Sequence, residues 1–276
     1  MWETSVIWWQ FAQYIYPQIM SYSITPIATV HSPYKQKFGI ARQPGLVPAA
    51  EICIELSPEF TADSVRGLED FDYVWISFIF HGVLDEGWAQ MVRPPRLGGK
   101  QKMGVFATRS PHRPNHLGLS LLKLERIETG KPVRIYCSGA DLLDGTPVVD
   151  IKPYIPFVES KPDASSGFVS GKPEELSVVW AESTLAEHLS TEEKHLIEQS
   201  IAQDPRPAYQ DIPERIYVMN IADYEVQFRI ENKCATVIKL SKIWLQIESF
   251  YKQKAVWNVQ TAFELSTDWL IQPVIL

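Results

Sequence analysis

Cysteine is scarce in this sequence of 276 residues. Its three cysteines, Cys53, Cys137 and Cys234, lie far apart and form no CxxC pair. A disulfide framework needs a denser, even set of cysteines, and a zinc site needs closely spaced ligand pairs. The sequence therefore predicts no metal. We interpret the cysteines as thiols in a reducing compartment, with Cys53 and Cys137 buried inside apolar runs.

The glycine-rich motifs that bind nucleotides are also absent. There is no GxGxxG after a strand, no GxxxxGK[ST], no GxSxG and no HExxH. These motifs mark dinucleotide-binding folds, P-loops, hydrolase nucleophiles and zinc peptidases. If the protein uses a nucleotide-like cofactor, we expect it to bind that cofactor without a Rossmann crevice.

No hydrophobic run in the sequence is long enough to predict a membrane span. The aromatic-rich stretch Trp2–Met20 carries one charge, Glu3, and is interrupted by Pro17 and three glutamines. It lacks the basic start and small-residue cleavage site of a signal peptide. We interpret residues 1–20 as a leader that is dispensable for folding or forms a dimer-contact arm, and we expect a cytoplasmic protein without a membrane partner.

Acidic residues are missing from residues 87–124, although the whole chain has a net charge of −7. The cations of this acid-free stretch are Arg93, Arg96, Lys100, Lys102, Arg109, Arg113 and Lys123. Several of the arginines are flanked by prolines, which restrict the backbone and lower the entropy lost when a charged side chain is ordered. Planar guanidinium groups bind phosphates and carboxylates in a bidentate manner. A basic stretch in an acidic protein favours one selective polyanion site.

Short runs of alternating apolar residues recur along the first half of the chain, with turn residues between them. These runs lie at Ile24–His31, Glu51–Leu56, Tyr73–Phe80, Lys102–Thr108, Leu119–Ile127, Val133–Ser138 and Val148–Ile151. Strands of this length with such punctuation are typical of an all-β sandwich or barrel. No long helical pattern alternates with them, which disfavours a parallel α/β fold. We therefore predict a mainly β fold with one helix at Thr61–Leu68.

The composition changes after Pro156. Residues 159–175 are rich in proline, serine and glycine and are predicted to be a linker between a domain at 21–158 and a second domain at 176–249. Within the second domain, a capping box starting at Ser190 predicts a helix that ends at Asp204-Pro205. Three strands near Arg215–Ile221, Glu225–Ile230 and Thr236–Leu240 complete a small α+β domain, and residues 250–276 remain an unassigned tail.

Three further loops are candidates to converge with the acid-free stretch. Arg42–Leu46 follows a strand, His81 ends another, and Gly139–Pro147 carries two carboxylates. Taken alone, His81 is more often structural than functional. Asp144 begins an ordinary Asp-Gly turn, whereas Asp141 precedes the turn and is the better candidate for chemistry.

Taken together, these segments resemble the TrmO (TsaA/YaeB-like) family over roughly residues 24–242. The matching text is Ser32–Lys35, Lys37–Gly39, Arg42–Leu46, Val92–Gly99, Gly104–Asn115, Asp141-Leu142, Asp144–Tyr154 and Asp204–Tyr209. The resemblance implies a single closed β-barrel that binds S-adenosylmethionine, and a homodimer with residues of one subunit near the cofactor of the other. It also implies that the small C-terminal domain helps to hold tRNA.

The resemblance carries a set of site residues over to this chain. The implied cofactor-binding residues are Gln43, Pro44, Gly45, Leu46, His81, Gly82, Arg109, Ser110, Leu119, Ser120, Ala140, Asp141 and Leu142. Substrate would be bound by Lys35, Arg93, Arg96, Asn115 and Arg206. We assign the catalytic roles to Arg42, Arg109, Arg113 and Asp141. The general base is left open among His81, Asp141 and the carboxylate of the substrate itself.

The implied activity is methylation of N6 of threonylcarbamoyladenosine at position 37 of tRNA, with S-adenosylmethionine as methyl donor. This N6 is a urea-type nitrogen, so it needs its proton removed at or near transfer. Two alternatives stay open. The same barrel could methylate another RNA base or a small molecule, or it could be a binding module that senses the cofactor without catalysis.

Overall fold

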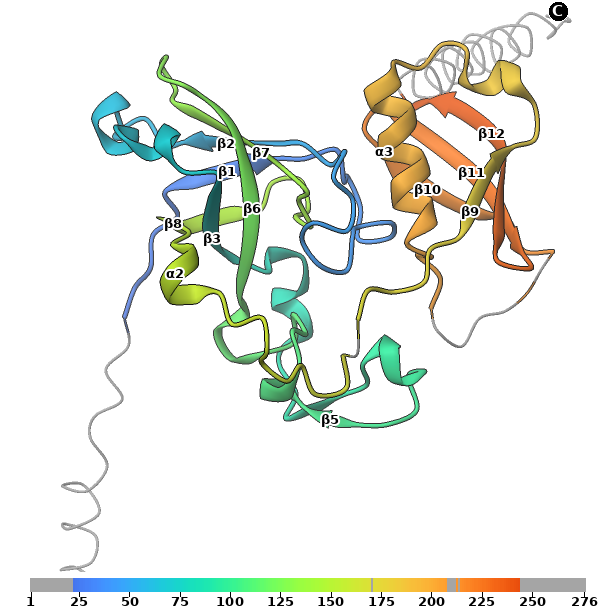
Figure 1. The fold of residues 1–276 in the computed structure, drawn as a ribbon, viewed down its shortest axis with the longest axis horizontal. Coiled ribbons are helices and arrows are strands. Elements are labelled where there is room, and N and C mark those ends of the chain that lie inside the picture. Colours follow the sequence, from blue (N-terminus) through green and yellow to red (C-terminus); the bar gives the residue numbers. More distant parts are fainter. Residues whose placement is uncertain (1–21, 170, 208–211, 213, 244–276) are drawn as a thin grey trace, which may run out of the picture.

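A computed structural model describes residues 22–169, 171–207, 212 and 214–243. Its N-terminal half is a closed barrel of six strands in the order β1-β2-β7-β6-β3-β8 (Figure 1). The strands are β1 (Ala28–His31), β2 (Ile52–Leu56), β3 (Tyr73–Ile79), β6 (Leu117–Glu128), β7 (Arg134–Ser138) and β8 (Pro147–Pro153). The predicted mainly β fold is confirmed, and the barrel rather than the sandwich is the form it takes.

Alternation along the strands explains the barrel core. In β2, Ile52, Ile54 and Leu56 are buried, while the residues between them face outward. In a strand, successive side chains point to opposite faces, so one apolar residue in two fills a barrel interior. Cys137 on β7 joins this core. The prediction that Cys53 is buried is wrong, because its odd position in β2 faces outward and leaves it half-buried.

Two predicted elements of the barrel region take a different form. Of the strand expected at Lys102–Thr108, only β5 (Met103–Gly104) forms, paired with β4 (Met91–Val92) outside the barrel, and a 3₁₀ turn follows at Val105–Ala107. The six other strands already close the barrel, so this segment has no sheet edge to join. The helix expected at Thr61–Leu68 is two 3₁₀ turns, Ala62–Val65 and Leu68–Asp70. Gly67 separates these turns with a left-handed φ of 81°.

The remaining short elements connect the strands. They are the 3₁₀ turns His81–Glu86, Pro95–Leu97, Pro114–His116 and Ser183–Ala186, and the helix α2 (Pro156–Glu159). None of the helices among the described residues is long and apolar enough to cross a bilayer. The leader predicted at residues 1–20 and the tail at 250–276 lie outside the described residues.

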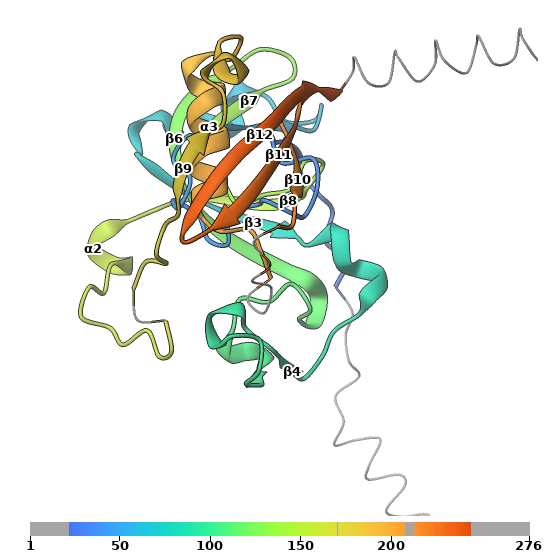
Figure 2. The same cartoon turned by 90° about the vertical axis from the view of Figure 1, so that its right-hand side faces the viewer.

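The C-terminal sheet has the order β10-β11-β12-β9, with helix α3 packed against it (Figure 2). Its elements are β9 (Ser177–Trp180), α3 (Thr191–Ala202), β10 (Tyr217–Ile221), β11 (Tyr224–Glu231) and β12 (Cys234–Lys242). The predicted capping box is confirmed: the Glu193 N–H donates to Ser190 Oγ at 3.1 Å, and the Ser190 N–H donates to the Glu193 carboxylate at 2.8 Å. Sequence analysis missed β9, which pairs in parallel with β12.

The segment 33–50 belongs to the barrel half of the chain but completes the C-terminal core. Tyr34, Ala41 and Val47 are buried among the residues of that second core. The Tyr34 hydroxyl lies 3.3 Å from Ser200 Oγ on α3, and burial raises the pKa of Tyr34 to about 12. Because this segment packs into the C-terminal core, the two halves of the chain are held against each other.

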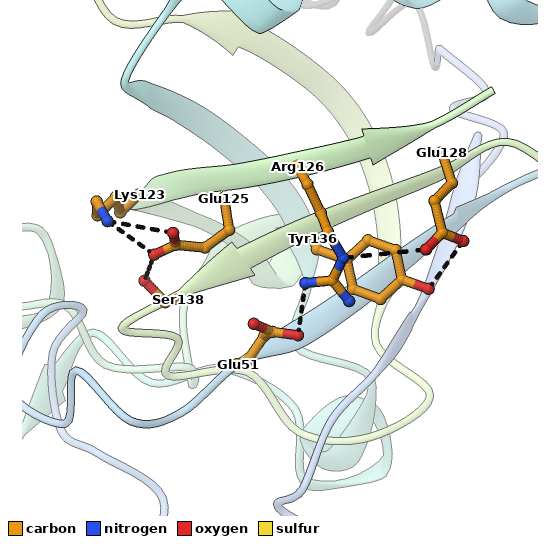
Figure 3. Close-up of polar contacts among 7 residues, drawn as sticks. All are labelled: Glu51, Lys123, Glu125, Arg126, Glu128, Tyr136 and Ser138. Atoms are coloured by element: carbon orange, nitrogen blue, oxygen red, sulfur yellow. Dashed lines mark hydrogen bonds and ion pairs between the residues drawn. The ribbon is translucent and has the colours of Figure 1, made fainter. Parts of the chain in front are cut away.

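On the outer face of β2, β6 and β7, polar side chains form a network in which they bond to one another (Figure 3). The Arg126 guanidinium lies 3.5 Å from the Tyr136 ring centroid and donates to Glu51 at 3.0 Å. Glu125 accepts bonds from Ser138 and Lys123, which together lower its pKa. Since these charges are matched within the protein, this face is a solvated exterior and is not the polyanion site expected from the sequence.

Candidate functional site

A cavity of about 1040 Å³ opens at the rim of the barrel. The four segments that were expected to converge all contribute to its lining. Of the predicted residues, those that line it are Arg42, Gln43, Pro44, His81, Gly82, Arg109, Arg113, Leu119, Ser120, Asp141 and Leu142. The fold therefore gathers at one cavity most of the residues assigned to cofactor binding and catalysis.

Two glycines hold two of these loops together. The Gly45 N–H donates to the Gly139 carbonyl at 2.8 Å, and Gly139 has a left-handed φ of 70°. A Cβ at Gly139 would lie 3.2 Å from the Gly45 Cα, so a side chain there would push the loops apart. Gly45, Leu46, Ser110 and Ala140 do not line the cavity. Gly45 acts through its backbone, which sets the position of the neighbouring residues that do.

The floor of the cavity is apolar and was missed by sequence analysis. Phe78 and Phe80 meet edge to face with ring centroids 5.0 Å apart, and both line the cavity. Gly118 on the neighbouring strand leaves room for Phe78, since a Cβ there would lie 2.3 Å from its ring. The alternation of β3 identifies these residues as strand positions, but it does not distinguish a core residue from one that borders a cavity.

Besides Asp150, which is paired with Lys152, Asp141 is the acid that lines the cavity. Its Oδ1 accepts a bond from the Ser120 hydroxyl at 2.7 Å. Burial raises the pKa of Asp141 to about 6, although the Ser120 hydroxyl and the Arg109 charge act to lower it. A carboxyl group with a pKa this close to neutrality can take up and release a proton under physiological conditions.

Arg109 and Arg113 bring positive charge to the same cavity. Arg109 Nη1 donates to Gln43 Oε1 at 2.6 Å, and Arg113 Nη1 donates to the Thr108 carbonyl at 3.4 Å. Thr108 closes the preceding turn through its bond to the Val105 carbonyl at 2.9 Å. Neither arginine forms an ion pair with any carboxylate of the described residues, so both charges are available to an anionic ligand.

Arg42 joins the cavity wall to the C-terminal domain. Its Nη2 donates to the carbonyl oxygens of Asp204 and Arg206, each at 2.9 Å. Residues 41–44 line the cavity, and Ala41 and Val47 also pack into the C-terminal core. Arg42, predicted to be catalytic, therefore lies at the cavity edge with part of its guanidinium committed to a structural contact.

The Arg42→Ala variant is expected to lower the free energy of unfolding by about 1 kcal/mol, because two charge-assisted bonds to exposed carbonyls are lost. Arg42→Lys should retain most of this stability, since an ammonium group can donate to the same two oxygens. Urea unfolding followed by tryptophan fluorescence measures both variants. Equal stability of Arg42→Ala and the unchanged protein would contradict the anchoring role.

The predicted substrate-binding residues lie outside the cavity lining and in different settings. Lys35 forms an ion pair with Asp144 at 3.0 Å. Burial alone would raise the pKa of Asp144, but the Ser32 N–H and Lys35 lower it. Arg206 contacts both carboxylate oxygens of Asp204, at 2.8 and 2.9 Å. The remaining predicted residues, Arg93, Arg96 and Asn115, are exposed.

Sequence analysis also missed an ion pair at the cavity. Lys37 lines the cavity and forms an ion pair with Glu86 at 2.8 Å, which lowers the pKa of Glu86. Among the described residues there is no group of three or more His, Cys, Asp and Glu that could hold a metal ion.

Comparison with known proteins places this chain in a family. The model of the tRNA-methyltransferase O N-terminal domain matches residues 29–160, and that of the TrmO C-terminal domain matches residues 173–243. A tRNA (adenine(37)-N6)-methyltransferase of Eikenella corrodens is 63% identical over 167 residues, which are 60% of this chain and 95% of that protein.

Two proteins of Pseudomonas aeruginosa extend the comparison. One, named a putative S-adenosylmethionine-dependent methyltransferase RcsF, is 44% identical over 217 residues, which are 76% of this chain and 93% of that protein. The other is a crystal structure of TrmO with a TM-score of 0.68 and 35% identity, covering 81% of this chain and 100% of that chain. Because the matched regions 29–160 and 173–243 include more than half of its 276 residues, the chain belongs to the TrmO family.

Proposed function

We propose that this chain is an S-adenosylmethionine-dependent methyltransferase that methylates N6 of threonylcarbamoyladenosine at position 37 of tRNA. The observation that carries the proposal is the cavity itself. Asp141, an acid with a pKa near neutrality, meets Arg109 and Arg113 there over an apolar floor, and neither arginine has a carboxylate partner among the described residues. The names of the relatives in Eikenella corrodens and Pseudomonas aeruginosa support the same reaction.

The cavity residues fit S-adenosylmethionine. The volume of about 1040 Å³ is at the upper end of small-molecule sites, which leaves room for donor and acceptor together. Phe78, Phe80 and Leu119 suit an adenine ring, and the Asp141 carboxylate suits the cationic groups of the donor. When bound, S-adenosylmethionine supplies a methyl group that its sulfonium makes electrophilic.

The side chains of this protein orient the acceptor and remove its proton. Arg109 and Arg113 bind the threonyl carboxylate or a neighbouring phosphate, which aligns N6 and lowers the entropy cost of transfer. Asp141 Oδ1 accepts a hydrogen bond from the Ser120 hydroxyl, and we assign Asp141 Oδ2 as the atom that takes the N6 proton. His81 lies on the same lining and is the alternative base.

The proposal includes a division of labour along the chain. Residues 21–158 bind the cofactor, 159–175 link the halves, and 176–249 contact tRNA. The packing of segment 33–50 into the C-terminal core supports this, because it holds that domain beside the cavity. A cytoplasmic homodimer completes the proposal, supported by Leu119, which lies at the cavity with 54% of its surface exposed and available for a second copy to cover.

Methyl transfer to purified tRNA with and without the threonylcarbamoyl group tests the proposed substrate. We expect transfer only to the modified tRNA, detected as the N6-methylated nucleoside by mass spectrometry. Equal transfer to both tRNAs would assign a different acceptor base. Cofactor binding without transfer to any cellular RNA would indicate a binding module instead of an enzyme.

The Lys100→Glu, Lys102→Glu variant is expected to weaken tRNA binding and to flatten its salt dependence, since about one unit of slope is lost for each phosphate contact removed. Cofactor affinity should stay unchanged, because the cofactor is small and carries little net charge. Parallel titrations of tRNA and S-adenosylmethionine at several salt concentrations measure both effects. A parallel fall in the two affinities would show that these lysines support the barrel and do not touch RNA.

A further inference from the structure

A hairpin of residues 88–106 projects from the barrel. Its short strands β4 and β5 pair Met91 with Gly104 and Val92 with Met103. In Figures 1 and 2 the hairpin lies at the lower edge of the molecule, away from the C-terminal sheet. Nothing in the cavity chemistry described above requires this extension.

The charges of the hairpin differ from those of the rest of the surface. Arg93, Arg96, Lys100 and Lys102 are exposed, and none forms an ion pair with a described residue. Several cations elsewhere on the barrel are paired with carboxylates, as Arg126 is with Glu51 and Arg134 with Glu55. Since the hairpin has no acid of its own and no ion pair with the described residues, its positive charge is available to a ligand.

The hairpin also presents aromatic rings to solvent. Phe106 has 79% of its surface exposed, and Trp88 has 56%. The backbone under Phe106 is firmly held: Val105 is buried, its N–H donates to the Gln90 carbonyl at 2.9 Å, and Thr108 closes the turn. A ring on an ordered turn loses little entropy when a ligand packs on it.

We propose that the 88–106 hairpin binds single-stranded RNA and that Phe106 stacks on a nucleobase next to the target adenosine. Unpaired bases are recognised by stacking on aromatic side chains, and cations beside the ring bind the backbone. Phe106 is three residues from Arg109, so their Cα atoms lie within about 11 Å. The proposal rests on the proposed function, because the target adenosine must reach the cavity that Arg109 lines.

The same charges argue against a second copy of this chain as the occupant. In a two-fold dimer, residue i of one copy contacts residue j of the other, so a hairpin that packs on its own counterpart meets only residues of a hairpin. Hairpin against hairpin would place two sets of unmatched cations side by side, whereas RNA supplies the opposite charge. RNA is therefore the occupant that matches both the rings and the charges.

Equilibrium binding of two RNAs tests the proposal: a stem-loop with an anticodon-type loop, and a duplex of the same stem without unpaired bases. We expect Phe106→Leu to weaken stem-loop binding about tenfold, equivalent to about 1.4 kcal/mol, and to leave duplex binding unchanged. Phe106→Tyr should bind like the unchanged protein, because it keeps the ring. Phe157→Leu is the matched control, since Phe157 is 88% exposed and belongs to α2, outside the acid-free stretch of residues 87–124.

Wild-type stem-loop binding by Phe106→Leu, or an equal loss for both RNAs, overturns the stacking role. So does a change of oligomeric state in sedimentation, which would make Phe106 a subunit contact. Methyl transfer by the unchanged protein is measured on the same preparation. A protein that methylates tRNA but ignores the Phe106 change refutes only the hairpin inference. A protein that never methylates tRNA, yet loses stem-loop binding when Phe106 is changed to Leu, refutes only the proposed function.

Discussion

The Arg109→Ala, Arg113→Ala double variant is expected to lose at least about a hundredfold in kcat/KM for tRNA, or about 2.7 kcal/mol of barrier, while staying folded. Both guanidinium groups lie at the cavity without carboxylate partners among the described residues, so their removal breaks no ion pair there. What is lost is the positive charge that orients the anionic part of the acceptor. Single-turnover methyl transfer, together with thermal unfolding, measures the two effects separately.

A matched control removes two arginines from the opposite setting. The Arg126→Ala, Arg134→Ala double variant removes two paired arginines. Arg126 is bound to Glu51 in the outer network of Figure 3, and Arg134 is bound to Glu55. This control should lose some stability and keep its activity. Wild-type turnover by a folded Arg109→Ala, Arg113→Ala protein would show that the acid-free stretch does not form the active site.

The parts of the fold that the sequence predicts well are those governed by local pattern. The alternation at Glu51–Leu56 and Tyr73–Phe80 locates β2 and β3 within one residue at each end. Ser190 and Glu193 mark the start of α3, because a capping box depends on residues only three apart. Lys102–Thr108 also contains an apolar run but has no free sheet edge to join, which local pattern does not reveal.

The parts of the site that sequence analysis missed depend on contacts between distant segments. Arg42 is predicted to be catalytic because arginine suits anions, yet its partners are carbonyl oxygens of residues 204 and 206. Phe78 has the pattern of a core residue and borders the cavity as well. Asp141, by contrast, was identified from its place before a turn, although its raised pKa follows from burial that only the fold creates.

The Asp141→Asn variant is expected to lower methyl transfer by about a hundredfold or more while stabilising the protein. The loss follows because an amide cannot accept the N6 proton, and general bases contribute about 10²- to 10⁴-fold. The gain follows from the pKa of about 6, which lies above the value of about 3.9 in an unfolded chain. Between these values the folded state holds the proton more tightly, so stability falls as pH rises from about 4 to about 6.

Above pH 6 the cost of the buried carboxylate is fully present, and Asp141→Asn removes it. The shift corresponds to at most about 3 kcal/mol, and partial contact with cavity water reduces the expected gain to about 1–2 kcal/mol. Urea unfolding should therefore show stabilisation at pH 7 and almost none at pH 4. A variant that is less stable than the unchanged protein at pH 7 would contradict the burial of a charged group at this position.

The pH profile of kcat/KM separates the role of Asp141 from a structural one. In the unchanged protein the rate should rise with pH through about 6, as the carboxylate ionises. The hydrogen bond from the Ser120 hydroxyl stabilises the ionised form of Asp141, so Ser120→Ala, which removes that bond, should move the rise to higher pH. Asp141→Asn should abolish the rise. If the residual activity of Asp141→Asn keeps the same rise, the group that titrates is elsewhere. His81, the other candidate base on the cavity lining, would then take the role, which His81→Ala would test directly.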